Sequence, residues 1–170
     1  AYTGPSGSLV VAPWASLAAG GAVSVVPGTA ALDIDVRAMQ IGAETMKGSI
    51  SASTTLALGA RDVLLGGELI AGALTVDATR NLIMGANGLV YGQGDVALRG
   101  ADVTLDGVLY GARDVLVEAS QSFTDAGRSG AQRVADRDLT VRVLRDADLR
   151  LNGGQIYAAE RTLTLSTQGA

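Results

Sequence analysis

Carboxylates that alternate along short runs are the first residues of this sequence whose types and spacing suggest chemistry. They occur as Asp33/Asp35, Asp136/Asp138 and Asp146/Asp148. Two carboxylates on one side of a strand are able to share acid–base work, as they do in enzymes that cleave polysaccharides. No histidine, lysine or third carboxylate joins Asp33 and Asp35 in a recognisable motif, so we assign no catalytic residue and expect solvated carboxylates. The other two pairs are expected to cap backbone amides in turns.

The composition narrows the chemistry further. The chain of 170 residues has no Cys and no His, which excludes disulfides, thiol catalysis and the commonest general base and metal ligand. The Gly-Gly-x-Gly-x-Asp pattern that binds calcium in other parallel solenoids does not occur. We therefore expect no metal and no cofactor. With 13 basic and 17 acidic residues the net charge is −4, which argues against nucleic acid as the main partner.

Short apolar runs that recur at a fixed period must position whatever site exists. The stretch 74–117 begins its runs at Leu74, Val96 and Val115, which are 22 and 19 residues apart. Each copy holds three strand-length pieces separated by polar or glycine-containing turns. A period of this size with several short strands per copy is typical of a solenoid. From residue 54 onward we divide the chain into repeats 54–73, 74–95, 96–114, 115–138 and 139–162, with another starting at Leu163.

These repeats predict an all-β fold, a right-handed parallel β-helix with three short strands in each coil of about 19–24 residues. The chain is 48% hydrophobic but only 4% aromatic, which suits a thin core of stacked aliphatic side chains. Roughly eight coils at a spacing of about 4.8 Å would make a shaft on the order of 40 Å tall. A β-propeller or β-sandwich is the alternative, but these folds favour repeats of about 40 residues or antiparallel hairpins.

The domain prediction is a single β-helix segment over 1–170, with irregular coils over 1–53 and regular repeats over 54–170. Residues 1–32 carry no charge, yet Pro5, Pro13 and Pro27 interrupt them, so they match neither a membrane span nor a signal peptide. The chain starts in the middle of the pattern, and we interpret it as a piece of a longer protein. The polar stretch 120–138 is expected to be an inserted loop that bulges from the shaft.

Tyrosines of the third strand form the first candidate binding site. The runs Val90-Tyr91-Gly92, Leu109-Tyr110-Gly111 and Ile156-Tyr157-Ala158 occupy equivalent places, and Leu69-Ile70-Ala71 precedes them. If the first residue of each run points inward, strand alternation turns Ile70, Tyr91, Tyr110 and Tyr157 outward as one ladder. Exposed tyrosine rings suit stacking on sugars. The alternatives are a ladder that only stabilises the sheet, and a reversed strand phase that buries the rings.

Arginines around the expected loop form the second candidate site. Arg128, Arg133 and Arg137 lie in it, and Arg142 and Arg145 follow. Such a cluster would attract sulfated glycans. Asp136 and Asp138 interleave these arginines and dilute the patch, so an ordinary solvated loop is the alternative.

The stretch 94–117 resembles the haemagglutinin repeats of large bacterial exoproteins exported by two-partner secretion, of the filamentous haemagglutinin type. Those repeats alternate apolar-x-apolar strands with Gly-Gly or Asp-Gly turns, as at Gly66-Gly67, Asp106-Gly107 and Gly153-Gly154. Residues 50–170 resemble them well, and residues 1–49 poorly. The resemblance implies a fibrous adhesin, secreted or displayed on the bacterial cell surface, with no catalytic site to transfer to this chain. The integrin-binding Arg-Gly-Asp motif of some members is absent here.

From the repeats and this resemblance we expect a shaft segment that mediates or presents attachment to host-cell glycans or receptors. Its other expected partner is the outer-membrane secretion pore during export, and we expect neither a membrane-spanning segment nor enzyme activity. One alternative is a purely structural spacer in a two-partner-secretion or contact-dependent inhibition exoprotein. The other is a β-helical polysaccharide lyase or hydrolase.

Overall fold

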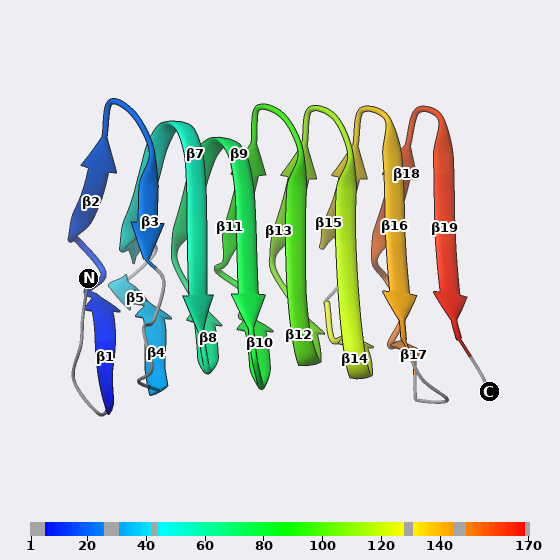
Figure 1. Cartoon of the computed structure of the whole chain (residues 1–170), viewed down its shortest axis with the longest axis horizontal. Coiled ribbons are helices and arrows are strands. Elements are labelled where there is room, and N and C mark those ends of the chain that lie inside the picture. Colours follow the sequence, from blue (N-terminus) through cyan, green and yellow to red (C-terminus); the bar gives the residue numbers. More distant parts are fainter. Residues whose placement is uncertain (1–5, 26–30, 42–43, 128–130, 145–148, 169–170) are drawn as a thin grey trace.

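The described residues wind into a right-handed parallel β-helix. The computed structural model describes residues 6–25, 31–41, 44–127, 131–144 and 149–168, and over these it contains strands but no helix. In Figure 1 the axis is horizontal, and the near strands, such as β7, β9, β16 and β19, all run the same way as the chain advances. The described residues complete about seven coils rather than the roughly eight expected. The predicted fold class is confirmed.

Three walls of parallel strands surround the core, and we number them in the order of the predicted repeat. Wall 1 contains β3 (Val23–Val25), the second parts of β7 (Ser49–Ala60) and β9 (Glu68–Ala78), the first parts of β12 (Val96–Leu105) and β14 (Val115–Asp125), β16 (Asp138–Val143) and β19 (Thr162–Thr167). Wall 2 contains β1 (Ser6–Val11), β4 (Ala31–Val36), β8 (Asp62–Leu65), β10 (Asn81–Met84), the second parts of β12 and β14, and β17 (Leu149–Leu151). Wall 3 contains β2 (Ser16–Ala19), the first parts of β7 and β9, β11 (Leu89–Gly92), β13 (Val108–Gly111), β15 (Gln132–Ala135) and β18 (Ile156–Ala159).

The residues predicted to start each repeat pair with one another in wall 1. Leu74 pairs with Val96, and Val96 with Val115. The same column continues through Leu139 to Leu163. From Leu74 to Leu139, every second residue of these strands is a buried aliphatic one, and this makes the register readable, because a slip by one residue would turn every core side chain outward.

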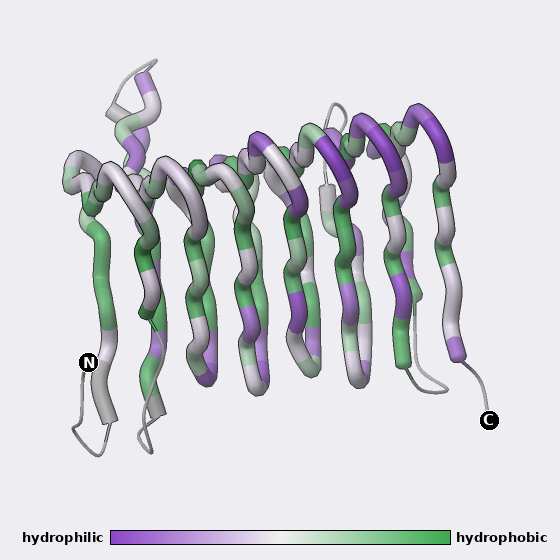
Figure 2. The backbone as a smooth tube through the Cα atoms, turned by 45° about the horizontal axis from the view of Figure 1, so that its top comes forward, coloured by the Kyte–Doolittle hydropathy of each residue, from purple (hydrophilic) through white to green (hydrophobic). Residues whose placement is uncertain are grey.

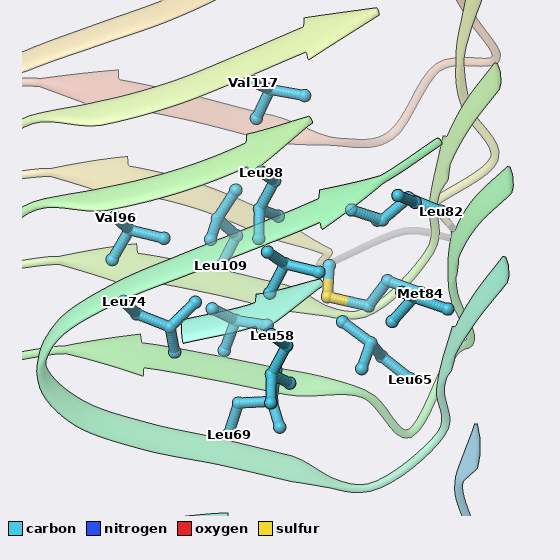
Figure 3. Packing of buried hydrophobic residues seen from close by; sticks show 14 of the residues in the cluster. Leu58, Leu65, Leu69, Leu74, Leu82, Met84, Val96, Leu98, Leu109 and Val117 are labelled. Carbon is cyan, nitrogen blue, oxygen red and sulfur yellow. The ribbon is translucent and has the colours of Figure 1, made fainter. Parts of the chain in front are cut away.

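The core is a continuous stack of aliphatic side chains. Inward residues of successive coils lie above one another, so that Leu82 sits between Val63 and Val103 in wall 2, and all three are essentially fully buried. Figure 3 shows the side chains of neighbouring coils converging inside the walls, and Figure 2 shows hydrophobic and hydrophilic residues alternating along many of the strands. Burying one such side chain stabilises the fold by about 1.5–3 kcal/mol, and its partners lie in the coils above and below.

Glycines form one corner of the shaft, between walls 2 and 3. Gly48, Gly67, Gly88 and Gly107 follow one another from coil to coil, and the amide after each of the last three donates to the carbonyl of the glycine below. A Cβ on Gly67 would lie 2.2 Å from the Gly48 carbonyl oxygen, and one on Gly107 would lie 2.1 Å from that of Gly88. Only glycine lets the backbones approach so closely, which explains the turns Gly66-Gly67 and Asp106-Gly107.

The repeated hexapeptide Gly-Ala-Arg-Asp-Val-Leu performs the same task at two different corners. At 59–64 it leads from wall 1 into wall 2, and at 111–116 it leads from wall 3 into wall 1. In both copies the arginine reaches back to an aspartate of the preceding coil: Arg61 pairs with Asp33 at 2.6 Å, and Arg113 with Asp95 at 3.4 Å. The hexapeptide is therefore a signal for turning a corner, independent of which corner it is.

An insertion explains the loose pattern of the first third. Between walls 2 and 3 of the second coil, β5 (Ala38–Ile41) and β6 (Glu44–Lys47) form an antiparallel hairpin that projects away from the coils (Figure 2). In wall 3, Leu17 pairs with Ile50, 33 residues later, whereas Ile50 pairs with Leu69, only 19 residues later.

The expected inserted loop over 120–138 is smaller than predicted. β14 continues as a strand as far as Asp125, and the third strand of that coil exists as β15. Residues 120–125 therefore belong to wall 2, paired with β12 and β17. The polar letters misled the prediction because Ser120, Ser122 and Thr124 point outward, where polar side chains are normal.

Candidate functional site

Tyr91 and Tyr110 form a stacked pair on the outer face of wall 3. They occupy the same position of β11 and β13 and pair directly in register. Their ring centroids lie 5.0 Å apart with planes inclined by 13°. The neighbours Val90 and Leu109 are fully buried, so alternation turns both rings outward as predicted. Tyr91 is 37% exposed.

The surroundings of this pair hold the rings in place. Ile70 precedes Tyr91 in the same column, as predicted, and Val134 follows Tyr110. The Tyr110 hydroxyl donates to a carboxylate oxygen of Asp136 at 2.7 Å. This hydrogen bond raises the pKa of Tyr110 to about 12. The result is an ordered pair of outward aromatic rings with apolar neighbours on both sides, a surface that the C–H groups of a sugar can contact.

Tyr157 does not belong to this ladder, contrary to the prediction. In wall 3 it pairs with Arg133, which pairs with Leu109. Tyr157 thus occupies an inward column, and the outward neighbour of Val134 is Ala158. The Tyr157 hydroxyl donates to Asp125, and burial followed by this hydrogen bond raises the pKa of Tyr157. The run Ile-Tyr-Ala mimics Val-Tyr-Gly, but here the aromatic residue takes the inward place.

Arg133 also points inward, which corrects its assignment to an exposed basic patch. Its side chain is 1% exposed and ion-pairs with Asp125 at 2.8 Å, inside the shaft. The guanidinium also donates to the carbonyl oxygens of Gly107 and Gln132. Arg133 is buried because β15 places it above Leu109 in the inward column. Asp125, in the inward column of β14, is its counterion. It is not available to a glycan.

Arg137, another arginine of the expected patch, is also paired with a carboxylate. Arg137 ion-pairs with Asp114 of the preceding coil at 3.4 Å. Arg128 lies outside the described residues, as does Arg145, while Arg142 binds Glu118. Paired guanidinium groups attract sulfate weakly because their charge is already neutralised. The structure therefore gives no support to a sulfated-glycan site at these residues.

The alternating carboxylates are also engaged in ion pairs or hydrogen bonds. Asp35 ion-pairs with Arg37 at 2.7 Å, as Asp33 does with Arg61. Asp138 binds Arg161, which lowers the pKa of Asp138 to about 2. Asp146 and Asp148 lie outside the described residues. Within the described ranges, no group of three or more acidic side chains is placed to hold a metal ion. Asp33 and Asp138 thereby link neighbouring coils.

A groove lies beside the hairpin, and sequence reasoning missed it. Its volume is about 530 Å³, and it runs along the wall 2–wall 3 corner past Trp14, Met39, Leu64 and Ile83. Trp14 is the only tryptophan of the chain and is 66% exposed. The only local signal was Pro13, since proline is favoured at the first central position of a turn and here places Trp14 in the turn as well. The groove itself joins four coils and a hairpin, which no local pattern reveals.

Over the described residues, no helix is long and apolar enough to cross a membrane. Compared with protein-family models, curated proteins and solved structures, the chain matches none of them.

Proposed function

We propose that this chain is a segment of the rigid shaft of a secreted bacterial adhesin of the haemagglutinin-repeat type, and that it takes part in attachment to host glycans. The observation that carries the proposal is the stacked, outward Tyr91–Tyr110 pair on a parallel β-helix. A stiff repetitive shaft suits a protein that must hold binding surfaces away from a cell. Export through an outer-membrane pore to the bacterial surface belongs to the same proposal and rests on the resemblance of the repeats.

The pair acts as a preorganised platform. Its two rings are already stacked and, at Tyr110, fixed by Asp136, so little side-chain freedom is lost when a sugar stacks on them. A single such contact is weak. Repeated contacts along one shaft, or between many shafts and one cell, raise the overall avidity by roughly 10²–10⁴ without any new kind of contact.

Binding of this chain to a glycan array and to cultured host cells tests the proposal. The double variant Tyr91→Ala/Tyr110→Ala is expected to weaken glycan binding by roughly tenfold, about 1.4 kcal/mol, because both aromatic rings are removed. Thr124→Ala serves as the matched control, since it truncates an outward side chain on wall 2 and leaves the tyrosine pair intact. Its binding should equal that of the parent chain.

Unchanged binding in the tyrosine double variant would overturn the platform. Absence of any binding by the parent chain would leave the segment as a spacer. The variant keeps the buried columns of wall 3, so circular dichroism should show an intact fold and separate lost binding from unfolding.

A further inference from the structure

A second face of the shaft carries a recess that the tyrosine platform does not use. The groove at Trp14 lies on the outer side of wall 2, at the corner toward wall 3. It is lined by the turn at Pro13-Trp14, by Met39 at the start of the hairpin, and by the outward side chains of Leu64 and Ile83. Leu64 and Ile83 are 44% and 39% exposed, a large exposure for residues of this size.

A local turn fixes the position of Trp14. The Ala15 amide donates to the Ala12 carbonyl oxygen at 2.9 Å and closes a four-residue turn with Pro13 and Trp14 in its centre. The turn is anchored to the next coil, because the Ser49 amide donates to the Ala15 carbonyl oxygen, also at 2.9 Å. The indole is therefore presented from a held backbone.

The apolar groove continues into a polar one. A second recess of about 300 Å³ shares Leu64 and Ile83 with the first and is otherwise lined mainly by polar groups. Among these are Asp62, Arg80 and Asn81, which form one hydrogen-bonded cluster. The combined recess crosses the first four coils, roughly 14 Å at a spacing of about 4.8 Å per coil. Its length suits a short chain of units better than a single small molecule.

The charges of the combined recess cancel. Its acids are Asp33, Asp35 and Asp62, and its bases are Arg37, Arg61 and Arg80, so three negative charges face three positive ones. They are paired within the recess: Arg37 with Asp35, Arg61 with Asp33, and Arg80 with Asp62. A ligand with a net charge would gain nothing from such a surface, whereas a neutral ligand with hydroxyl groups finds donors and acceptors in fixed planes.

From these features we infer that the recess between Trp14 and Asn81 is a binding site for a neutral oligosaccharide. A pyranose ring presents an apolar face of C–H groups, which stacks on the Trp14 indole, and a rim of hydroxyls, which bond to the paired carboxylates and guanidinium groups. Leu64 and Ile83 cover the apolar face of the next sugar. The site lies on a different wall from Tyr91 and Tyr110, and its argument does not depend on them.

Trp14 reports on its own site, because it is the only tryptophan of the chain. The intact chain is titrated with neutral hexasaccharides of glucose, xylose, mannose and N-acetylglucosamine while tryptophan emission is followed. At least one of them should produce a saturable change. Trp14→Ala should weaken the binding of that sugar at least tenfold by calorimetry, and Trp14→Phe should weaken it less, because a ring remains.

Two further variants show whether the tryptophan signal arises from this recess alone. Thr104→Ala replaces the outward residue that follows Ile83 in the same column, just beyond the groove, and should bind like the parent chain. Tyr91→Ala/Tyr110→Ala should also leave the Trp14 signal unchanged, so the failure of one site does not imply failure of the other. Because Trp14 is exposed and its turn is held by backbone hydrogen bonds, truncating it leaves the core intact.

Three results would overturn the inference. They are the absence of a saturable response to every neutral hexasaccharide, full sugar affinity in Trp14→Ala, and a response to heparin or to an apolar peptide without any response to neutral sugars. The last result would mark the recess as a site for charged glycans or for a protein segment.

Discussion

The Arg133 guanidinium lies 2.8 Å from the Asp125 carboxylate, and both side chains are buried inside the shaft. One coil earlier the same two columns hold Leu109 and Leu105. The Gly127 amide and the Tyr157 hydroxyl also donate to Asp125, so the carboxylate is well satisfied. The hydrogen-bonding capacity of Arg133 is less completely used, because its Nε has no partner among the described residues. A polar cluster thus interrupts an aliphatic core.

Breaking this buried pair is expected to destabilise the shaft strongly. Asp125→Ala leaves the Arg133 charge buried without its counterion, which should lower the free energy of unfolding by about 3–5 kcal/mol. Asp77→Ala is the matched control, because Asp77 pairs with Arg99 at 3.1 Å but its side chain is 55% exposed. That change should cost less than about 1 kcal/mol. Chemical denaturation of the two variants makes the comparison.

A double variant tests whether the pair adds net stability to the fold or only favours one arrangement of the chain. Asp125→Leu/Arg133→Leu restores the residues found one coil earlier and removes both buried charges. Because desolvation offsets much of the attraction within such pairs, we expect most of the stability lost in Asp125→Ala to return. Equal losses in the single and double variants would show that the cluster is needed for its hydrogen bonds to Gly127 and Tyr157.

This cluster is also a feature that the sequence did not predict. The coil starts at Leu74, Val96 and Val115 were predictable, because alternation over whole strands leaves one register that buries all the aliphatic residues. In Gln132–Ala135 the same rule meets an arginine at the inward position. Composition alone assigns an arginine to the surface. Only the partner Asp125, on another wall, makes the inward position acceptable.

The binding surfaces show the same division. Tyr91 and Tyr110 were found because both flank buried residues in neighbouring coils, a purely local pattern. Trp14 was not found, because its importance depends on Leu64, Ile83 and a hairpin that come together only in the folded chain. Features that repeat from coil to coil can be predicted from the sequence. Features formed by residues of different coils and an inserted hairpin cannot.

The glycine corner predicts a position-specific cost for adding one methyl group. Gly107→Ala would place its Cβ 2.1 Å from the Gly88 carbonyl oxygen, so backbones of two coils must separate. We expect a loss of about 1–3 kcal/mol in the free energy of unfolding. Gly85→Ala is the control in the same region, since its nearest neighbour is 3.9 Å away and its φ is not positive. Similar losses in both variants would rule out the close approach as the cause.

The outer face of wall 1 carries charges that alternate in sign from coil to coil. Asp77, Arg99, Glu118 and Arg142 pair successively in one column. Glu118→Lys would place three positive charges in a row, and cross-strand like charges destabilise a sheet. We expect Glu118→Lys to lower the thermal midpoint more than Glu118→Gln does, and the gap between them to shrink in 1 M salt. A gap that does not depend on salt would mean that packing, not charge, distinguishes the variants.

The corner ion pairs predict how the shaft responds to acid. Hydrogen bonds from Arg80 lower the pKa of Asp62 to about 2, and those from Arg161 do the same for Asp138. Because both folded values lie below the ordinary 3.8, their stabilising contribution is present above that pH and is lost as the pH falls from about 3.8 toward 2. Carboxyl titrations by NMR should show both groups ionised at pH 3. In Arg80→Gln the pKa of Asp62 should rise toward 3.8 while Asp138 still titrates near 2, and an unchanged Asp62 would disprove the role of Arg80.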